Sequence, residues 1–187
     1  MGKNNLPNVI SLIRIALVPP FIMALTDGRY FTALLLFAVA GLSDALDGYL
    51  AKRHGWKSRL GSILDPLADK ILLVSAYVTL AWLDLLPAWL VAVILGRDVM
   101  IVGGALVYHY TIRRFDLAPT WISKVNTVLQ ITLVLAVMFK LSILPLPEWS
   151  IGALVYLVLT FTIWSWLDYV WTWSARALQM NTQGRRD

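Results

Sequence analysis

The sequence predicts an all-α integral membrane protein: a bundle of six transmembrane helices with the active site at the cytoplasmic side. Hydrophobic residues make up 59% of the 187 residues and the mean hydropathy is positive, which is too apolar for an ordinary soluble domain. The apolar residues form six runs, each near the roughly 20 residues that span a bilayer. Four aspartates lie within the second and third of these runs, near the loop that joins them, where an ionised carboxylate is costly unless it has a function.

The first run, 8–26, contains Arg14 and the pair Pro19-Pro20. It lacks a small-residue cleavage site, so we expect a retained helix and not a cleavable signal. The run stops before Asp27-Gly28, a dipeptide typical of turns. The second and third runs, 30–51 and 62–83, are joined by a basic loop and carry the aspartates on either side of it.

The remaining three runs follow prolines. The fourth, 87–110, begins at Pro87, and the fifth, 121–143, comes shortly after Pro119. Pro145-Leu146-Pro147 separates the fifth run from the sixth, 149–173. Helices are predicted for all six because lipid leaves the backbone no other hydrogen-bond partner and no alternating barrel pattern occurs. No repeat or second domain is visible, so the sequence predicts one membrane domain over 1–187.

The loop charges predict the orientation. One set of loops and both ends carry most of the cations, namely Lys52, Arg53, Lys57, Arg59, Arg113, Arg114, Lys3, Arg176, Arg185 and Arg186, whereas the opposite side has only Arg29 and Lys140. The positive-inside rule then places both termini and the aspartates on the cytoplasmic face of a bacterial-type inner (cytoplasmic) membrane, which the chain crosses several times. The formal charge of +5 is scattered in short loops, which fits anionic membrane lipid and not nucleic acid. Because cysteine is absent, disulfides, thiolate zinc sites and cysteine nucleophiles are excluded.

Helical spacing groups the aspartates into two sets. Asp44 and Asp47 lie three residues apart, and Asp65 and Asp69 lie four apart, so each pair shares a helix face. Helix capping would explain one such residue but not four within apolar flanks. Carboxylate oxygens favour magnesium, manganese or calcium over zinc. Two such ions could bridge a pyrophosphate and steady a nucleotide leaving group.

The stretch SDALDGYLAKRHGWKSRLGSILDPLADK resembles the signature of the CDP-alcohol phosphatidyltransferases, D-x2-D-G-x2-A-R-x8-G-x3-D-x3-D. Every spacing is kept, with matches at Asp44, Asp47, Gly48, Ala51, Gly61, Asp65 and Asp69. Lys52 stands where the family has arginine. A lysine keeps the charge but loses the planar fork that binds phosphate in a bidentate manner.

The resemblance implies two divalent cations, Mg²⁺ or Mn²⁺, held by Asp44, Asp47, Asp65 and Asp69. It also implies that Asp69 is the base that takes a proton from an acceptor hydroxyl, which attacks the lipid-side phosphorus of CDP-diacylglycerol and releases CMP. The contacts to CDP-diacylglycerol are expected from Gly48, Ala51, Lys52 and Gly61, and from Asn8 and Arg14 of the first helix, where the spacing of Asn8, Ser11 and Arg14 places all three toward one face. Arg14 has an alternative role, since it could snorkel to the surface. A homodimer is implied as well.

Cations in the fourth and fifth runs suggest an acceptor that carries a phosphate. Arg97 and Lys124 lie inside apolar runs, Asp98 could pair with either of them, and the intervening loop adds Arg113 and Arg114. The opening NLPNVISLIRIALVP resembles both bacterial phosphatidylglycerophosphate synthases and eukaryotic-type cardiolipin synthases. GRDVMIVGG and PTWISKVNTVLQ look closer to the cardiolipin synthases, and LTFTIWSWLDYV looks closer to the phosphatidylglycerophosphate synthases. Glycerol 3-phosphate is the leading acceptor, because that branch of the family is the commoner one in bacteria, and phosphatidylglycerol is the alternative.

Two other classes of protein are considered as explanations of the buried carboxylates, a transporter and a structural scaffold. A cation-coupled membrane transporter could bind its ion at such residues. However, the aspartates cluster toward one surface and no repeat is evident, whereas transporter sites tend to lie at the midplane between repeats. A purely structural scaffold would leave the buried charge without a role.

Overall fold

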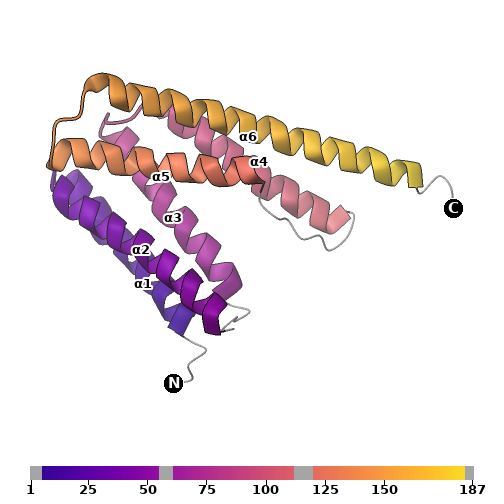
Figure 1. Cartoon of the computed structure of the whole chain (residues 1–187), viewed down its shortest axis with the longest axis horizontal. Coiled ribbons are helices and arrows are strands. Elements are labelled where there is room, and N and C mark those ends of the chain that lie inside the picture. The colour runs from indigo at the N-terminus through magenta and orange to yellow at the C-terminus, as the bar shows by residue number, and fades with distance from the viewer. Residues whose placement is uncertain (1–5, 55–60, 112–119, 184–187) are drawn as a thin grey trace. The chain divides into compact units, whose positions relative to one another are not determined.

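The computed structural model describes residues 6–54, 61–111 and 120–183, and over these ranges the chain forms six α-helices (Figure 1). They are α1 (Leu6–Thr26), α2 (Tyr30–His54), α3 (Gly61–Trp82), α4 (Ala88–Thr111), α5 (Trp121–Ser142) and α6 (Glu148–Gln183). Each predicted run coincides with one helix, so the all-α prediction is confirmed. The last helix differs most, because α6 continues past the predicted end at 173 to Gln183.

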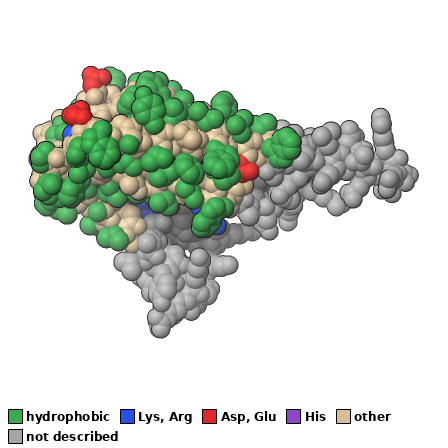
Figure 2. Space-filling view, turned by 45° about the horizontal axis from the view of Figure 1, so that its top comes forward, with side chains coloured by type: hydrophobic (Ala, Val, Ile, Leu, Met, Phe, Trp, Pro, Cys, Tyr) green, Lys and Arg blue, Asp and Glu red, His purple; other side chains and the backbone are tan. Residues whose placement is uncertain are grey.

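By length and composition alone, two stretches among the described residues could cross a membrane, Trp121–Ser142 and Glu148–Trp171. Ile10–Thr26 and Tyr30–Ser43 are shorter apolar helical segments. Large hydrophobic side chains are exposed on several helices, and Figure 2 shows them over much of the coloured surface. An exposed apolar surface of this kind fits contact with lipid. Six membrane crossings stay a prediction.

The chain divides into two compact units, and the first comprises Met1–Ala88 and Val134–Pro147. Its first turn closes α1 with paired bonds, from the Arg29 N–H to the Ala24 carbonyl at 2.8 Å and from the Gly28 N–H to the Leu25 carbonyl at 3.1 Å. Gly28 has a φ of 72°, which a residue without a Cβ adopts easily. The same pairing ends α3, where Asp84 takes a φ of 56°.

Small buried residues bring the helices of the first unit together. α1 contacts both α2 and α3, and α2 contacts α3. Ala33 of α2 and Ala76 of α3 are fully buried, which permits the close backbone approach typical of helices in membranes. Phe21 and Phe37 join α1 to α2 with ring centroids 5.6 Å apart. As a result, three helices are held in a fixed register around an apolar core.

The second unit comprises Trp89–Leu133 and Glu148–Asp187, and polar groups make up much of its interior. Buried leucine and valine side chains, such as Leu90 and Val158, accompany buried arginine, aspartate, serine, asparagine and threonine side chains. Polar groups inside an apolar helical unit are expensive unless they bond to one another or bind a ligand. These buried polar side chains include Arg97 and Asp98, which the sequence pattern singles out.

Candidate active site

The aspartate motif lies at one end of the first unit. Because α1 and α2 form a hairpin and α3 runs back alongside them, the beginning of α1, the end of α2 and the beginning of α3 lie at the same end (Figure 1). Asp44 and Asp47 belong to the last turns of α2, and Asp65 and Asp69 belong to the first turns of α3. The backbone therefore brings the two halves of the motif to adjoining helix ends.

Asp69 is held by an arginine from a neighbouring helix. Nη1 of Arg14 in α1 donates a hydrogen bond to Oδ1 of Asp69, so the two form an ion pair between α1 and α3. The Arg14 side chain is 0% exposed, whereas that of Asp69 is 49% exposed. The idea that Arg14 snorkels to the surface is therefore wrong. Its guanidinium fixes a carboxylate that is still open to solvent and to a ligand.

Several predicted site residues cannot be placed at the level of their side chains. Asn8, Asp44, Asp47, Gly48, Ala51, Lys52, Gly61 and Asp65 lie on α1, α2 or α3, but their side chains are outside the described residues. Arg113 and Arg114 lie entirely outside the described ranges. The four carboxylates that would hold the cations are thus related by their helix positions alone. Oxygen donors at adjoining helix ends, one of them half exposed, suit a hard divalent cation.

Arg97 lies at the centre of a buried polar cluster in the second unit. Its Nη1 donates to Oδ1 of Asp98 at 2.8 Å, and its Nη2 donates to the hydroxyls of Ser123 at 2.6 Å and Ser165 at 2.7 Å. The guanidinium also lies 5.9 Å from the centroid of the Tyr169 ring, which is within cation–π range. One arginine therefore links α4 to both α5 and α6. Of the two cations expected as possible partners of Asp98, Arg97 is the one that pairs with it.

Part of this cluster fits an anion-binding role. The Nε of Arg97 is buried and has no hydrogen-bond partner among the described residues, so a donor is left over. Lys124 follows Ser123 on α5 but is exposed, and nothing in the described residues brings it against Arg97. Ser123, Ser165 and Tyr169 were not expected from the sequence. The only indication of these residues in the sequence is that they are polar and recur at helical spacing inside an apolar run.

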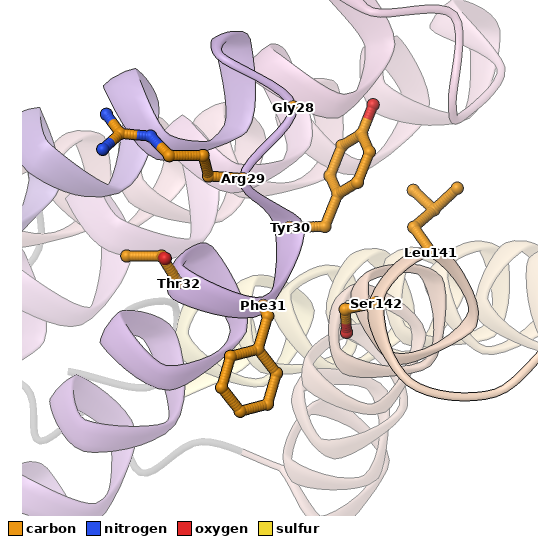
Figure 3. Close-up of a pocket in the computed structure, with 7 residues that line it drawn as sticks. All are labelled: Gly28, Arg29, Tyr30, Phe31, Thr32, Leu141 and Ser142. Atoms are coloured by element: carbon orange, nitrogen blue, oxygen red, sulfur yellow. The ribbon is translucent and has the colours of Figure 1, made fainter.

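A separate pocket of about 340 Å³ lies at the other end of α2, lined by Gly28, Arg29, Tyr30, Phe31, Thr32, Leu141 and Ser142 (Figure 3). Figure 3 shows Arg29 extending away from Leu141 and Ser142, and its guanidinium pairs with Asp27 at 2.6 Å. Asp44 lies fourteen positions after Tyr30 on α2, which is about 21 Å along a helix at 1.5 Å per residue. This pocket is not the motif site.

Replacing Arg14 by glutamine is expected to lower the free energy of unfolding by about 1.5–3 kcal/mol, the usual range for a hydrogen bond to a charged group. Arg29→Gln is the matched control, because it breaks an arginine–aspartate pair whose side chains are 60% and 52% exposed. Exposed pairs contribute about 0–1 kcal/mol. Thermal or denaturant unfolding in detergent measures both variants. Equal losses would show that the pair of Arg14 with Asp69 adds no more stability than an exposed pair does.

Comparison with known proteins agrees with the motif. The family model described as CDP-alcohol phosphatidyltransferase matches residues 4–180, a range that includes all four aspartates. The chain is 40% identical over 147 residues to a cardiolipin synthase (CMP-forming) of Homo sapiens, covering 70% of this chain and 49% of the relative. It therefore spans about half the length of that synthase.

Two bacterial relatives match over nearly their whole length. A CDP-diacylglycerol--glycerol-3-phosphate 3-phosphatidyltransferase of Blochmanniella floridana is 30% identical over 189 residues, with 95% of both chains covered. The protein of that name from Escherichia coli (strain K12) is 31% identical over 174 residues, with 89% of this chain and 93% of the relative covered. With a family model that spans most of the chain and a motif in which every spacing is kept, this protein belongs to the CDP-alcohol phosphatidyltransferase family.

Proposed function

We propose that this protein transfers the phosphatidyl group of CDP-diacylglycerol to a hydroxyl of a glycerol-type acceptor and releases CMP, as a step of phospholipid biosynthesis. The observation that carries this proposal is the arrival of both halves of the aspartate motif at adjoining ends of α2 and α3. Membership of an enzyme family also argues against the transporter and scaffold alternatives. CMP release from CDP-diacylglycerol by the purified protein tests the activity itself.

Divalent cations are generally used by CDP-alcohol phosphatidyltransferases. In this chain two ions, Mg²⁺ or Mn²⁺, would be held by Asp44, Asp47, Asp65 and Asp69. When bound, they would neutralise charge on the diphosphate and on the departing CMP. Gly48, Ala51 and Gly61 are small enough for the nucleotide to approach the backbone closely, and Lys52 and Asn8 supply a cation and an amide beside it.

Asp69 is the proposed general base. Its carboxylate accepts the proton of the acceptor hydroxyl while that oxygen forms a bond to the lipid-side phosphorus and the bond from phosphorus to the CMP oxygen breaks. The ion pair with Arg14 supports this role, since it fixes the orientation of a carboxylate that is half exposed. A proton acceptor must be held in position to be effective. Arg14 thus acts through Asp69, in addition to its expected place beside CDP-diacylglycerol.

The leading acceptor is glycerol 3-phosphate, bound by Arg97 and Lys124 with Arg113 and Arg114 from the loop. Two features support it. The Nε of Arg97 is a buried donor without a partner among the described residues, and a phosphate oxygen would satisfy it. In addition, the relatives that match over nearly their full length are named for glycerol 3-phosphate.

Phosphatidylglycerol is the second candidate acceptor, which would make the product cardiolipin. The higher identity, 40%, to cardiolipin synthases favours it. Supplying purified protein with CDP-diacylglycerol and each acceptor in turn, and identifying the lipids by mass, separates the two. Phosphatidylglycerophosphate would support the leading candidate, whereas cardiolipin without it would establish the alternative.

Arg97→Ala and Lys124→Ala are each expected to raise the apparent KM for the acceptor about 10- to 100-fold, while the KM for CDP-diacylglycerol changes little. The factor follows from the loss of a hydrogen bond to a charged group. Lys124 gives the cleaner test, because Arg97 also ties three helices together. Lys140→Ala, at the other end of α5, is the control. Equal changes in both KM values would argue against an acceptor site here.

The membrane arrangement is proposed from the same features. Six helices would cross a bacterial-type inner membrane as a single domain, with both termini and the aspartates on the cytoplasmic side. The two apolar helices support membrane insertion, and the distribution of Lys and Arg supports the orientation. Association as a homodimer belongs to the same proposal. Labelling of single cysteines introduced at each terminus tests the orientation, because the chain has no cysteine of its own.

A further inference from the structure

Two successive layers of polar contacts join α5 to α6. In the first layer, Ser123 and Ser165 both accept hydrogen bonds from Arg97. In the second, the hydroxyl of Thr162 donates to Oδ1 of Asn126 at 3.0 Å. Asn126 lies three residues after Ser123, and Thr162 lies three residues before Ser165, so the two layers are one helical turn apart on antiparallel helices.

The second layer has a donor to spare. Asn126 is 0% exposed, and its Oδ1 accepts the hydrogen bond from the Thr162 hydroxyl. The other end, Nδ2, is buried and has no hydrogen-bond partner among the described residues. Buried amide donors are almost always paired, and the demand is stronger where lipid replaces water. A donor that is oriented on one side and unpaired on the other points to a ligand.

Arg97 leaves a donor of the same kind in the neighbouring layer. Its Nε is buried and unpaired among the described residues, like Nδ2 of Asn126. Both groups are N–H donors and one of them belongs to a cation, so a ligand that offers oxygen acceptors and negative charge would suit either of them. A phosphate with adjoining hydroxyls has both, whereas an acyl chain has neither.

We propose that Asn126 is a further substrate-contacting residue, which donates a hydrogen bond from Nδ2 to an oxygen of the acceptor's glycerol-phosphate headgroup. This inference rests on the proposed function and extends it from Arg97 to the next turn of α5. Thr162 is a positioning residue, because its hydroxyl orients the amide without touching the acceptor. The headgroup chemistry is shared by free glycerol 3-phosphate and by phosphatidylglycerol, so both are used in the test.

Asn126→Asp is the most direct variant, because it keeps the shape and an oxygen for Thr162 but replaces the donor with an acceptor. It is expected to raise the apparent KM of the acceptor at least tenfold, equivalent to about 1.4 kcal/mol, with little change in the KM for CDP-diacylglycerol. Asn126→Leu removes the donor without adding charge and should act in the same direction. Thr162→Val removes only the orienting hydroxyl and should raise the acceptor KM by a smaller factor.

Thr160→Val is the matched control on α6, since that exposed hydroxyl donates only to the backbone oxygen of Tyr156, at 2.8 Å. It should leave both KM values unchanged. Binding is measured separately, as an increase in the melting temperature of the protein. The ligand is either glycerol 3-phosphate at about 10 mM or phosphatidylglycerol micelles. The increase should be reduced in Asn126→Leu and Asn126→Asp and retained in Thr160→Val.

The outcomes separate this inference from the proposed function. If the wild-type protein forms product with neither acceptor, the proposed function fails, and this inference fails with it. If the wild-type protein is active but the Asn126 variants and Thr162→Val keep the wild-type acceptor KM, the inference alone is overturned and the Asn126–Thr162 pair only links two helices. Should the Asn126 variants fail to fold, Thr162→Val against Thr160→Val decides in the same way.

Discussion

Replacing Asp69 by asparagine is expected to lower the rate of phosphatidyl transfer by about 10²- to 10⁴-fold, the usual contribution of a general base. The amide cannot take a proton from the acceptor hydroxyl. It does keep an oxygen that can accept from Arg14, so the buried guanidinium is still paired and the protein should fold. CMP release under saturating substrates measures the rate, and equilibrium binding of a CDP-containing lipid should still be detectable.

Asp84→Asn is the control for this variant. Asp84 lies beyond the other end of α3, exposed and with a φ of 56°, a conformation that asparagine tolerates well. Its replacement should change neither rate nor stability. A rate for Asp69→Asn above about a tenth of wild type would remove Asp69 from the role of base.

Alanine at Asp44, Asp47 or Asp65 is expected to lower activity by about 10²-fold or more, since each change removes a group placed to stabilise charge through a bound cation. Unlike Asp69→Asn, these variants should weaken cation and nucleotide binding together, because both depend on the same carboxylates. Titration with Mn²⁺, followed by its electron paramagnetic resonance signal, measures cation binding directly. Chelation of divalent ions should likewise abolish wild-type activity, and added Mg²⁺ or Mn²⁺ should restore it.

Asp27→Ala is the control for the ligand variants, because this aspartate lies in the exposed turn between α1 and α2 and pairs with Arg29. It should bind Mn²⁺ as the wild type does. If all three motif variants kept the wild-type dependence of activity on metal concentration, the assignment of these aspartates as ligands would be wrong.

The helices were predictable because their signals are local. Apolar runs of bilayer length and the turn at Asp27-Gly28 are visible in short windows of sequence, and the helix bounds follow them closely. α6 shows where this fails. Its residues after 173 are too polar to count as a span, but they include alanine, leucine and glutamine, which favour helix. Hydropathy locates a membrane span, whereas backbone propensity decides where the helix ends.

Only those features of the site that depend on spacing within one helix could be predicted from the sequence. The motif aspartates could be assigned to helix faces, and the pairing of Asp98 with a cation could be anticipated. The partner of Asp69 could not, because a bond between α1 and α3 depends on how the helices pack. The same holds for Ser123, Ser165 and the Asn126–Thr162 pair, since isolated small polar residues are common in apolar helices and only packing shows which of them meet.

If α1 and α3 cross the membrane as proposed, the ion pair between Arg14 and Asp69 also constrains how the chain is inserted during synthesis. An arginine within a hydrophobic segment adds about 2.5–3.5 kcal/mol to the free energy of entry through the translocon. α1 emerges from the ribosome well before α3, so its charge has no partner at that stage. In the proposed membrane arrangement, stable integration of the first segment would then depend on a later one, and α1 and α3 would reach their final environment as a pair. A residue beside the proposed general base would thereby also affect the order of membrane assembly.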